Sequence, residues 1–241
     1  MNALPEDSLP QDVGARWLQA MRSGDWEAAW QQTDRLELPR RQRAHSAGFH
    51  PQAHHLRWDG TPFAGRSVLV RCLHGLGDTL QYMRFVPQVA AQARALHFLV
   101  QPMLLDLLQG LPGLGEVSNA WTDDPPAHEV EIEVMELAYA LRATTQSVPP
   151  PYPHLAGAAA EWTRPLPQPA ASGLRVGVLW AASDWDPSRS MPLDALAPLF
   201  EVPGACFYSL QQGEARHDPA AQRFGLVPLW PHTQTIEAAA A

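Results

Sequence analysis

Apolar residues near the start of the chain recur at the spacing of two successive helices. The first stripe is Trp17, Leu18 and Met21, and the second is Trp26, Ala29 and Trp30. Side chains three and four positions apart share one face of a helix, and Gly24-Asp25 between the stripes is a typical break. Residues 11–38 are therefore predicted to form two short helices, within a helical hairpin domain of residues 1–45.

From residue 66 the apolar pattern changes to short strands separated by helices. Strands are predicted at residues 67–72, 96–100, 116–117 and 130–134, and helices at residues 79–95 and 102–108. The expected buried side of the longer helix carries Leu80, Met83, Phe85 and Val86. The run at 67–72 is apolar almost throughout, as in a parallel strand covered on both faces. Alternating strands and helices indicate a doubly wound parallel sheet, a Rossmann-like α/β fold, for a domain of residues 46–165.

A second unit of the same kind is predicted after a proline-rich stretch. The prolines are Pro149, Pro150, Pro151, Pro153, Pro165, Pro167 and Pro169. They favour a semi-rigid connection between domains. Strands at residues 174–180 and 205–210, with a helix at 191–200 between them, begin a partial second Rossmann-like domain of residues 172–241. A helix starts at Ile236 with no strand after it. We therefore expect the chain to stop before this domain is complete, and its uncovered sheet edge to promote self-association.

The charge balance narrows the classes of function. The 241 residues carry a formal net charge of −8, and all 17 basic residues are arginines. Without lysine the chain has no Schiff-base lysine and no phosphate-loop lysine. An acidic balance argues against nucleic acid as a partner. The basic cluster Arg40, Arg41 and Arg43 is expected to lie in a solvated linker.

Cysteine usage and apolar run length add two further expectations. Cys72 and Cys206 stand far apart without a CxxC pair, so neither a disulfide framework nor a zinc site is predicted. No secretory signal follows Met1, and the apolar runs are too short to cross a bilayer. The sequence therefore predicts a cytoplasmic protein without a transmembrane segment.

The predicted helical hairpin is similar in pattern to a single helical repeat. Its tryptophan–leucine stripe followed by Gly-Asp-Trp-Glu-Ala-Ala at residues 24–29 resembles one tetratricopeptide-type hairpin, and an ordinary helical hairpin fits equally well. One such unit cannot bury its own apolar face, because repeat stability comes from stacked neighbours. The hairpin is therefore expected to pack on the following domain or on a partner.

The first candidate for chemistry is Gly75-Leu76-Gly77-Asp78, between a predicted strand and a predicted helix. Glycines allow a sharp turn and a close approach of the backbone to a ligand. Asp78 at the helix start is either an N-cap or a functional carboxylate. The segment is not a dinucleotide fingerprint, since Leu80 stands where the third glycine would be.

Two weaker candidates lie in the second unit. Arg189-Ser190 precedes a predicted helix, and an arginine in a loop at the carboxyl end of a parallel strand suits a diphosphate. A surface arginine on a loop is the alternative. Gln211, within the segment from Ser209 to Gly213, follows the next strand and has little meaning alone.

Taken in order, these segments carry a resemblance to a known family. They begin with Trp58-Asp59-Gly60, the glycine turn and the segment Thr79-Leu-Gln81-Tyr-Met-Arg84-Phe-Val-Pro87, and continue with Gln101-Pro102, Leu111-Pro112-Gly113, Pro151-Tyr152, residues 177–181, 189–193 and 209–213. This order resembles the glycosyltransferase region that follows tetratricopeptide repeats in bacterial proteins, and is similar to the ADP-heptose–lipopolysaccharide heptosyltransferases. It covers roughly residues 56–240.

The resemblance implies two facing Rossmann-like domains of the GT-B type. The acceptor would bind mainly to the first domain and the nucleotide-sugar donor mainly to the second. Asp78 would be the general base, and the implied substrate-binding residues are Gly75, Gly77, Gln81, Arg84, Arg189, Ser190 and Gln211. Arg189 would hold the leaving diphosphate, near a position where the family commonly has a lysine, with no metal or other cofactor. The family continues with a further strand, a histidine-bearing helix start and a glycine turn around the donor.

Two function classes follow. The first is a glycosyltransferase-like protein that moves a sugar from a nucleotide donor to a hydroxyl acceptor, a glycan or a protein, and that is expected to be inactive or impaired in a chain of this length. The second is a non-catalytic binding or scaffold module derived from such an enzyme. A nicotinamide-dependent oxidoreductase is disfavoured because the glycine fingerprint is absent.

Overall fold

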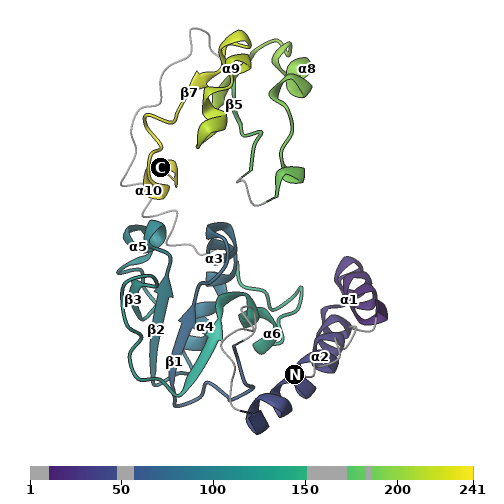
Figure 1. Cartoon of the computed structure of the whole chain (residues 1–241), viewed down its shortest axis with the longest axis vertical. Helices are drawn as coiled ribbons and strands as arrows, with labels where there is room; N and C mark the ends of the chain where they lie inside the picture. Colours follow the sequence, from purple (N-terminus) through teal and green to yellow (C-terminus); the bar gives the residue numbers. More distant parts are fainter. Residues whose placement is uncertain (1–10, 48–56, 151–172, 183–185, 241) are drawn as a thin grey trace, which may run out of the picture. The chain divides into compact units, whose positions relative to one another are not determined.

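The computed structural model describes residues 11–47, 57–150, 173–182 and 186–240 (Figure 1). The chain divides into two compact units, Met1–Leu155 and Ala156–Ala241. The proline-rich connection expected from the sequence falls mostly at residues 151–172, outside the described residues. None of the described helices is long and apolar enough to cross a membrane.

The first unit begins with the predicted helical hairpin. Helix α1 spans Gln11–Ser23 and helix α2 spans Trp26–Ala47. The turn between them has Gly24 at φ +78°, a left-handed conformation that favours glycine. Asp25 then accepts a hydrogen bond from the backbone N–H of Ala28 at 3.0 Å and so caps the start of α2.

Helix α2 is longer than predicted and includes the basic cluster. It continues through Pro39, although proline removes one helical hydrogen bond. The expectation of a solvated linker at Arg40 and Arg41 is therefore wrong. Arg40 pairs with Glu37 at 2.6 Å and donates to the carbonyl of Trp58 at 3.0 Å, and the guanidinium of Arg41 lies 4.4 Å above the Trp58 ring. These contacts across the chain stabilise the last turns of the helix.

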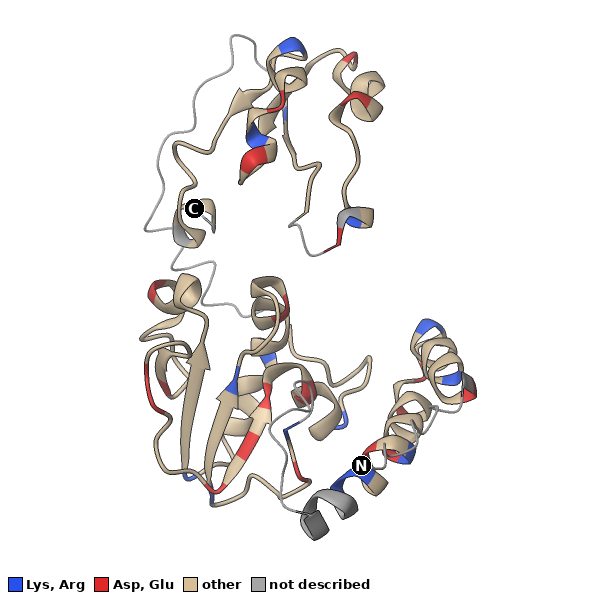
Figure 2. Ribbon diagram, in the orientation of Figure 1, with Lys and Arg blue, Asp and Glu red and all other residues tan. Residues whose placement is uncertain are grey.

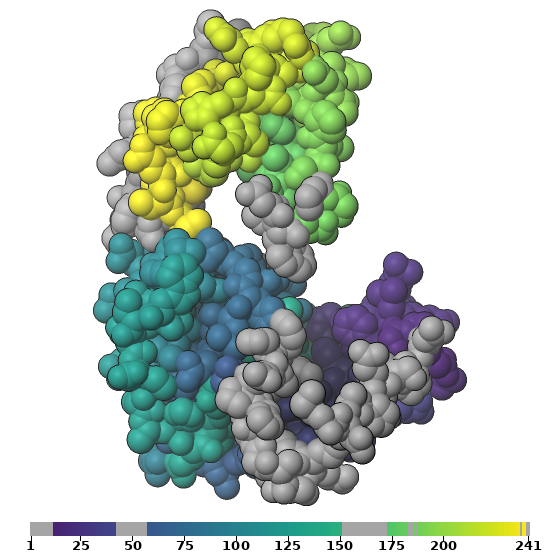
Figure 3. Space-filling model, in the orientation of Figure 1, coloured from purple at the N-terminus to yellow at the C-terminus, as the bar shows by residue number. Residues whose placement is uncertain are grey.

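The hairpin packs on the following domain, which is one of the two outcomes expected. Trp30 donates from its indole nitrogen to the carbonyl of Ala143 at 2.6 Å. Asp34 accepts from the Tyr139 hydroxyl and from Arg142, both at 2.6 Å. The hairpin adjoins the sheet domain in the space-filling view (Figure 3).

A four-stranded parallel sheet forms the body of the first unit, as predicted. Its strands are β1 (Ser67–Arg71), β2 (Ala95–Val100), β3 (Glu116–Asn119) and β4 (Val130–Glu133). Their order is β3-β2-β1-β4, so β1 is central, and each adjacent pair is parallel. Leu69, Phe98 and Ile132 are fully buried in this sheet. The arrangement is compatible with a Rossmann-like fold.

The predicted helix at 79–95 is broken in the structure. Helix α3 (Leu76–Tyr82) is followed by a 3-10 turn, η1 (Met83–Phe85), and by α4 (Val86–Ala90). Pro87 lacks an N–H and its ring clashes with the preceding turn, so the helical ladder cannot run through it. Met83, Phe85 and Val86 are buried as expected, and Leu80 is half-buried.

The remaining helices of the first unit are short. Helix α5 spans Pro102–Leu108, as predicted. After β4 the chain forms the 3-10 turn η2 (Val134–Glu136) and helix α6 (Leu137–Ala140). Acidic positions of β4 lie beside a basic position of β1 (Figure 2). In register, Arg71 pairs with Glu133, and the Arg71 guanidinium contacts Glu131 at 2.6 Å.

The second unit contains a smaller parallel sheet, also as predicted. Its strands are β5 (Leu174–Val178), β6 (Ala205–Ser209) and β7 (Val227–Pro228), in that order. The other described elements are η3 (Pro187–Arg189), η4 (Leu193–Leu196), α8 (Ala197–Phe200), η5 (Glu214–His217), α9 (Pro219–Arg223) and α10 (Ile236–Ala240).

The helix expected at 191–200 is a 3-10 turn followed by a single α-helical turn. Pro192 and Pro198 cannot donate backbone hydrogen bonds, which limits regular helix there. The N–H of Met191 instead donates to the carbonyl of Trp180 at 3.0 Å. Trp180 and Leu193 are buried in the core of this unit.

Candidate functional site

The candidate site lies at the carboxyl ends of β1 and of its neighbour β4, an edge strand of the first sheet. In open parallel sheets, ligands bind outside the carboxyl ends of the strands. Strand β1 leads there into Cys72, Leu73, His74 and the glycine turn, and β4 ends at Glu133. The prediction that residues 75–78 follow the carboxyl end of the first strand is confirmed.

A buried carboxylate and a histidine meet at this edge. Glu133 is fully buried, and its Oε1 lies 3.0 Å from Nδ1 of His74. Oε1 also accepts from the N–H of Leu73 at 3.3 Å, and Oε2 accepts from the N–H of Met135 at 2.6 Å. The backbone thus fixes the carboxylate beside the imidazole.

A second buried network fixes the start of α3. Gln101 donates to the carbonyl of His74 at 2.8 Å and accepts from the hydroxyl of Thr79 at 3.0 Å. Cys72 lies beside this network, and its burial raises the pKa of the thiol well above its usual range. A thiol that stays protonated is a poor nucleophile, so Cys72 is structural.

Asp78 is the third residue of α3 and not its N-cap. Gly75 takes the N-cap position in an extended conformation, and Oδ2 of Asp78 accepts from the Gly75 N–H at 3.0 Å. This is the back-bonding half of a capping box. A Cβ built at Gly75 would lie 3.0 Å from Oδ2 of Asp78, whereas one at Gly77 would meet nothing within 4 Å. The small residue at position 75 therefore leaves room for the carboxylate.

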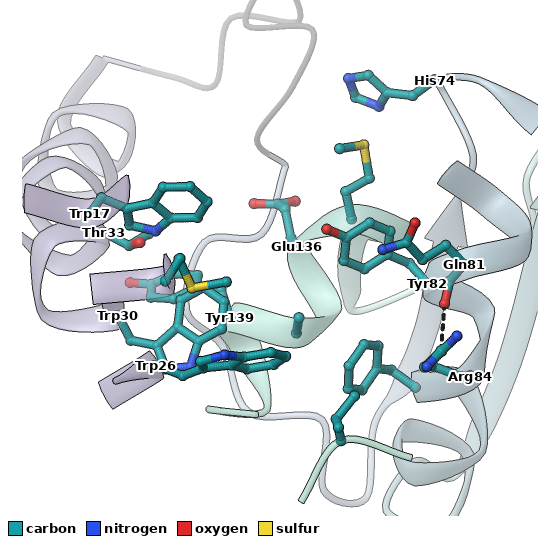
Figure 4. A pocket seen from close by; sticks show the side chains of 15 residues that line it. Trp17, Trp26, Trp30, Thr33, His74, Gln81, Tyr82, Arg84, Glu136 and Tyr139 are labelled. Atoms are coloured by element: carbon teal, nitrogen blue, oxygen red, sulfur yellow. Dashed lines mark hydrogen bonds between the residues drawn. The ribbon is translucent and has the colours of Figure 1, made fainter. Parts of the chain in front are cut away.

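A pocket of about 690 Å³ opens between the hairpin and the sheet domain (Figure 4). The hairpin contributes Trp17, Met21, Trp26, Trp30 and Thr33. The segment around α3 contributes His74, Gln81, Tyr82, Arg84 and Phe85. The far wall consists of Met135, Glu136, Ala138, Tyr139 and Val148. The lining is mostly apolar and aromatic, with a few polar groups among the rings.

Glu136 is the buried acidic group of this lining. It is only 4% exposed, and Oε2 accepts from the backbone N–H groups of Arg57, Trp58 and Glu133 at 2.8, 3.0 and 3.1 Å. Oε1 has no hydrogen-bond partner within the described part of the chain. Burial raises the pKa of this carboxyl, although the three N–H groups act in the opposite direction.

Two of the predicted binding residues line the pocket. Arg84 donates to the carbonyls of Gln81 at 2.9 Å and Pro149 at 3.3 Å, so the backbone holds its guanidinium in place (Figure 4). The side chain of Gln81 is exposed. The nearby Tyr82 hydroxyl has a raised pKa, mainly because of burial and also because of the charges of Asp78 and Glu133.

The predicted residues of the second unit gather at the ends of β5 and β6. The hydroxyl of Ser190 accepts from the N–H of Ala182 at 2.9 Å, and Arg189 is exposed at the end of η3. Gln211 is buried, and its amide oxygen accepts from the N–H groups of Trp180 and Ala181. Its amide nitrogen donates to the carbonyls of Ala181 and Gln212. Gln211 therefore joins the two loops, and its assignment to ligand binding stays a prediction.

Sequence reasoning did not single out Glu133, Glu136 or His74. A carboxylate at the last residue of the strand Val130–Glu133 was the available signal, because strand ends face the ligand edge of a parallel sheet. His74 stands directly before the glycine turn. The sequence predicts the hairpin tryptophans as an apolar packing stripe of a repeat-like hairpin, and not as the wall of a pocket.

The described residues contain no group of three His, Cys, Asp or Glu side chains placed to hold a metal ion. Comparison of the chain with protein-family models, with curated proteins and with solved structures finds no match.

Proposed function

We propose that this protein transfers a sugar from a nucleotide-sugar donor to a hydroxyl acceptor, using two Rossmann-like units in the manner of a GT-B glycosyltransferase. The observation that carries the proposal is the position of Asp78. It lies on the glycine turn after the central strand, three residues before Gln81 on the short helix whose side chains reach the pocket. Asp78 does not line the pocket itself, but it lies about one helical turn before Gln81 and Tyr82, which do.

The transfer reaction needs a base that accepts the proton of the acceptor hydroxyl and a cationic group that stabilises the leaving nucleoside diphosphate. Oδ2 of Asp78 is engaged by the Gly75 N–H, which leaves Oδ1 to accept the proton of the acceptor hydroxyl. The hydroxyl oxygen then forms a bond to the anomeric carbon, and the bond to the diphosphate oxygen breaks, with its electron pair going to the diphosphate. A planar arginine cation suits that diphosphate, and the resemblance assigns this role to Arg189, which is exposed in the second unit.

The test is release of nucleoside diphosphate. The purified chain is incubated with UDP-, GDP- and ADP-sugars, with and without an acceptor mixture, and the released nucleoside diphosphate is measured. Asp78→Asn keeps an oxygen for the Gly75 N–H, so we expect an unchanged melting temperature and a turnover lower by about two to four orders of magnitude. Asp106→Asn, an exposed aspartate of α5 away from the pocket, is the matched control. Equal turnover in both variants would contradict the role of Asp78.

A non-catalytic binding module is the second candidate. An aromatic pocket can bind a ligand without catalysing a reaction, which favours this candidate. The side-chain amide of Gln211 is already hydrogen-bonded to backbone groups, so this predicted binding residue has a structural role in the fold. Binding of nucleotide sugars or acceptors without any release of diphosphate would support the module over the enzyme.

A further inference from the structure

The walls of the pocket between the hairpin and the sheet domain present flat aromatic faces. Trp30 is almost buried and packs edge-on against Trp26, with ring centres 6.1 Å apart, and tilted against Tyr139 at 5.9 Å. Trp17 and Trp26 are half-buried, so part of each residue remains accessible to a ligand. Figure 4 shows these rings facing Tyr82 and Gln81 across the pocket.

A pure hydrocarbon is a poor match for this pocket because of Glu136. Its Oε1 is buried without a partner in the described part of the chain, and a buried acceptor that stays unsatisfied is costly. A ligand hydroxyl that reaches this oxygen would relieve that cost, which a hydrocarbon cannot do.

The charged groups at the pocket disfavour both anionic and cationic ligands. An anion would meet Glu136 in the wall and the negative charges of Asp78 and Glu133, which also act on the Tyr82 hydroxyl. Arg84 also lines the pocket, but two backbone carbonyls already accept hydrogen bonds from its guanidinium.

A cationic ligand would compete with arginines of the chain itself. The guanidinium of Arg142 lies 4.7 Å from the centre of the Tyr139 ring, and that of Arg41 lies 5.3 Å from it. The aromatic face that would attract an ammonium group therefore already carries positive charge.

From these constraints we infer that the pocket binds a neutral saccharide. A sugar ring presents C–H groups on its faces, which pack on Trp17 and Trp26, and hydroxyls at its edge, one of which donates to Oε1 of Glu136. The exposed amide of Gln81 serves a further hydroxyl. A volume of about 690 Å³ has room for more than one ring. One part of this inference rests on the proposed function: if the protein is a glycosyltransferase, the neutral glycan in this pocket is its acceptor.

The test measures saccharide binding without any nucleotide sugar. The full chain is applied to an array of neutral and anionic glycans, and hits are titrated by isothermal calorimetry beside glucose 6-phosphate, tetramethylammonium and an unglycosylated peptide mixture. We expect neutral glycans to bind and the other three probes not to bind. Trp17→Ala and Trp26→Ala should each weaken binding at least tenfold, with melting temperatures showing that both variants fold.

Trp121→Ala is the matched control, because Trp121 is 67% exposed in the same unit and lies outside the pocket lining. It should leave saccharide affinity unchanged. If a folded Trp17→Ala variant loses affinity, Trp17→Phe should recover part of it, since a flat ring is restored.

The inference is overturned if no neutral glycan binds, if the anion, the cation or the peptides bind instead, or if Trp17→Ala and Trp26→Ala bind as well as the wild type. Failure of the proposed function has a different signature. Glycan binding that depends on Trp17, without diphosphate release from any donor, would retain this site and remove the enzyme. Sugar transfer that is unchanged in Trp17→Ala and Trp26→Ala would support the enzyme and contradict the saccharide site in this pocket.

Discussion

Oε1 of Glu133 lies 3.0 Å from Nδ1 of His74, joining the carboxyl end of β4 to the chain that leaves β1. The carboxylate is fully buried and also accepts backbone hydrogen bonds from Leu73 and Met135. A buried charge is tolerated only with such partners. This pair therefore couples the stability of the sheet edge to the geometry of the candidate site.

Glu133→Gln should destabilise the first unit. The amide keeps the shape but loses the charge that faces His74, and one buried N–H loses its charged acceptor. We expect the free energy of unfolding to fall by about 1–3 kcal/mol, measured by urea denaturation. Glu116→Gln is the control, because Glu116 faces His97 at 3.5 Å with its side chain 79% exposed. Such a surface pair contributes little, so an equal effect of both variants would contradict a special role for Glu133.

The contact between the hairpin and the sheet domain should weaken in acid. Burial acts to raise the pKa of Asp34, but hydrogen bonds from Arg142 and Tyr139 outweigh it, and the pKa lies below its usual value. A folded-state pKa below the unfolded value adds stability above about pH 4, which is lost as the pH falls through the folded-state pKa. Burial, together with the bond to Asp34, raises the pKa of Tyr139 to about 12, so this donor stays protonated.

Asp34→Asn should accordingly cost about 1–2 kcal/mol at pH 7 and almost nothing near pH 2. The measurement is the difference in unfolding free energy between wild type and variant across that range. Asp12→Asn serves as the control, because Asp12 lies on the exposed side of the same hairpin. A cost of Asp34→Asn that does not depend on pH would show that its charge is unimportant.

Gln211→Ala should destabilise the second unit. Its side chain makes four hydrogen bonds to the backbone at 3.0–3.1 Å, and truncation leaves the N–H groups of Trp180 and Ala181 without this acceptor. We expect a loss of about 2–4 kcal/mol in denaturant unfolding. The neighbouring Gln212→Ala removes exposed hydrogen bonds to Thr233 and should cost much less. Similar losses in the two variants would contradict the bridging role.

The two cysteines should differ in reactivity. Cys72 is 2% exposed with a raised thiol pKa, whereas Cys206 is partly accessible. In the native state, a thiol reagent such as DTNB should label Cys206 first and Cys72 only after unfolding. The Cys72→Ser and Cys206→Ser variants assign the signals. Fast native labelling of the Cys206→Ser variant would show that Cys72 is less protected than the structure indicates.

Self-association through the second unit stays a prediction. In the described sheet β5 is an edge strand, and its first residue, Leu174, is 71% exposed. Exposed apolar edges favour pairing with another chain. Light scattering should show a mass that rises with concentration, and Leu174→Glu should reduce the rise. Val202→Glu is the control, because Val202 is an apolar residue that is 49% exposed in a loop and not on a strand. This variant should leave the rise of mass with concentration nearly unchanged.

The sequence by itself determined the strands and their parallel arrangement. The apolar runs at β1 and β2 predict buried strands, the alternating Val130–Glu133 predicts a further strand, and short strands separated by helices pair in parallel. It also determined the glycine turn, since residues 75–78 stand between a strand and a helix. These features depend on residues close together in the chain, so a local pattern is enough to predict them.

Only the tertiary structure decided which side chains meet. The contact between His74 and Glu133 depends on the register of β1 with β4, which sets Arg71 opposite Glu133. The pocket depends on how α1 and α2 dock against the segment after β4, through Trp30, Asp34 and Tyr139. The same docking buried Arg41, which the local charge pattern predicted to be solvated. Such pairings bring together residues distant in the chain, and their geometry is set by packing of the whole unit and not by any local periodicity.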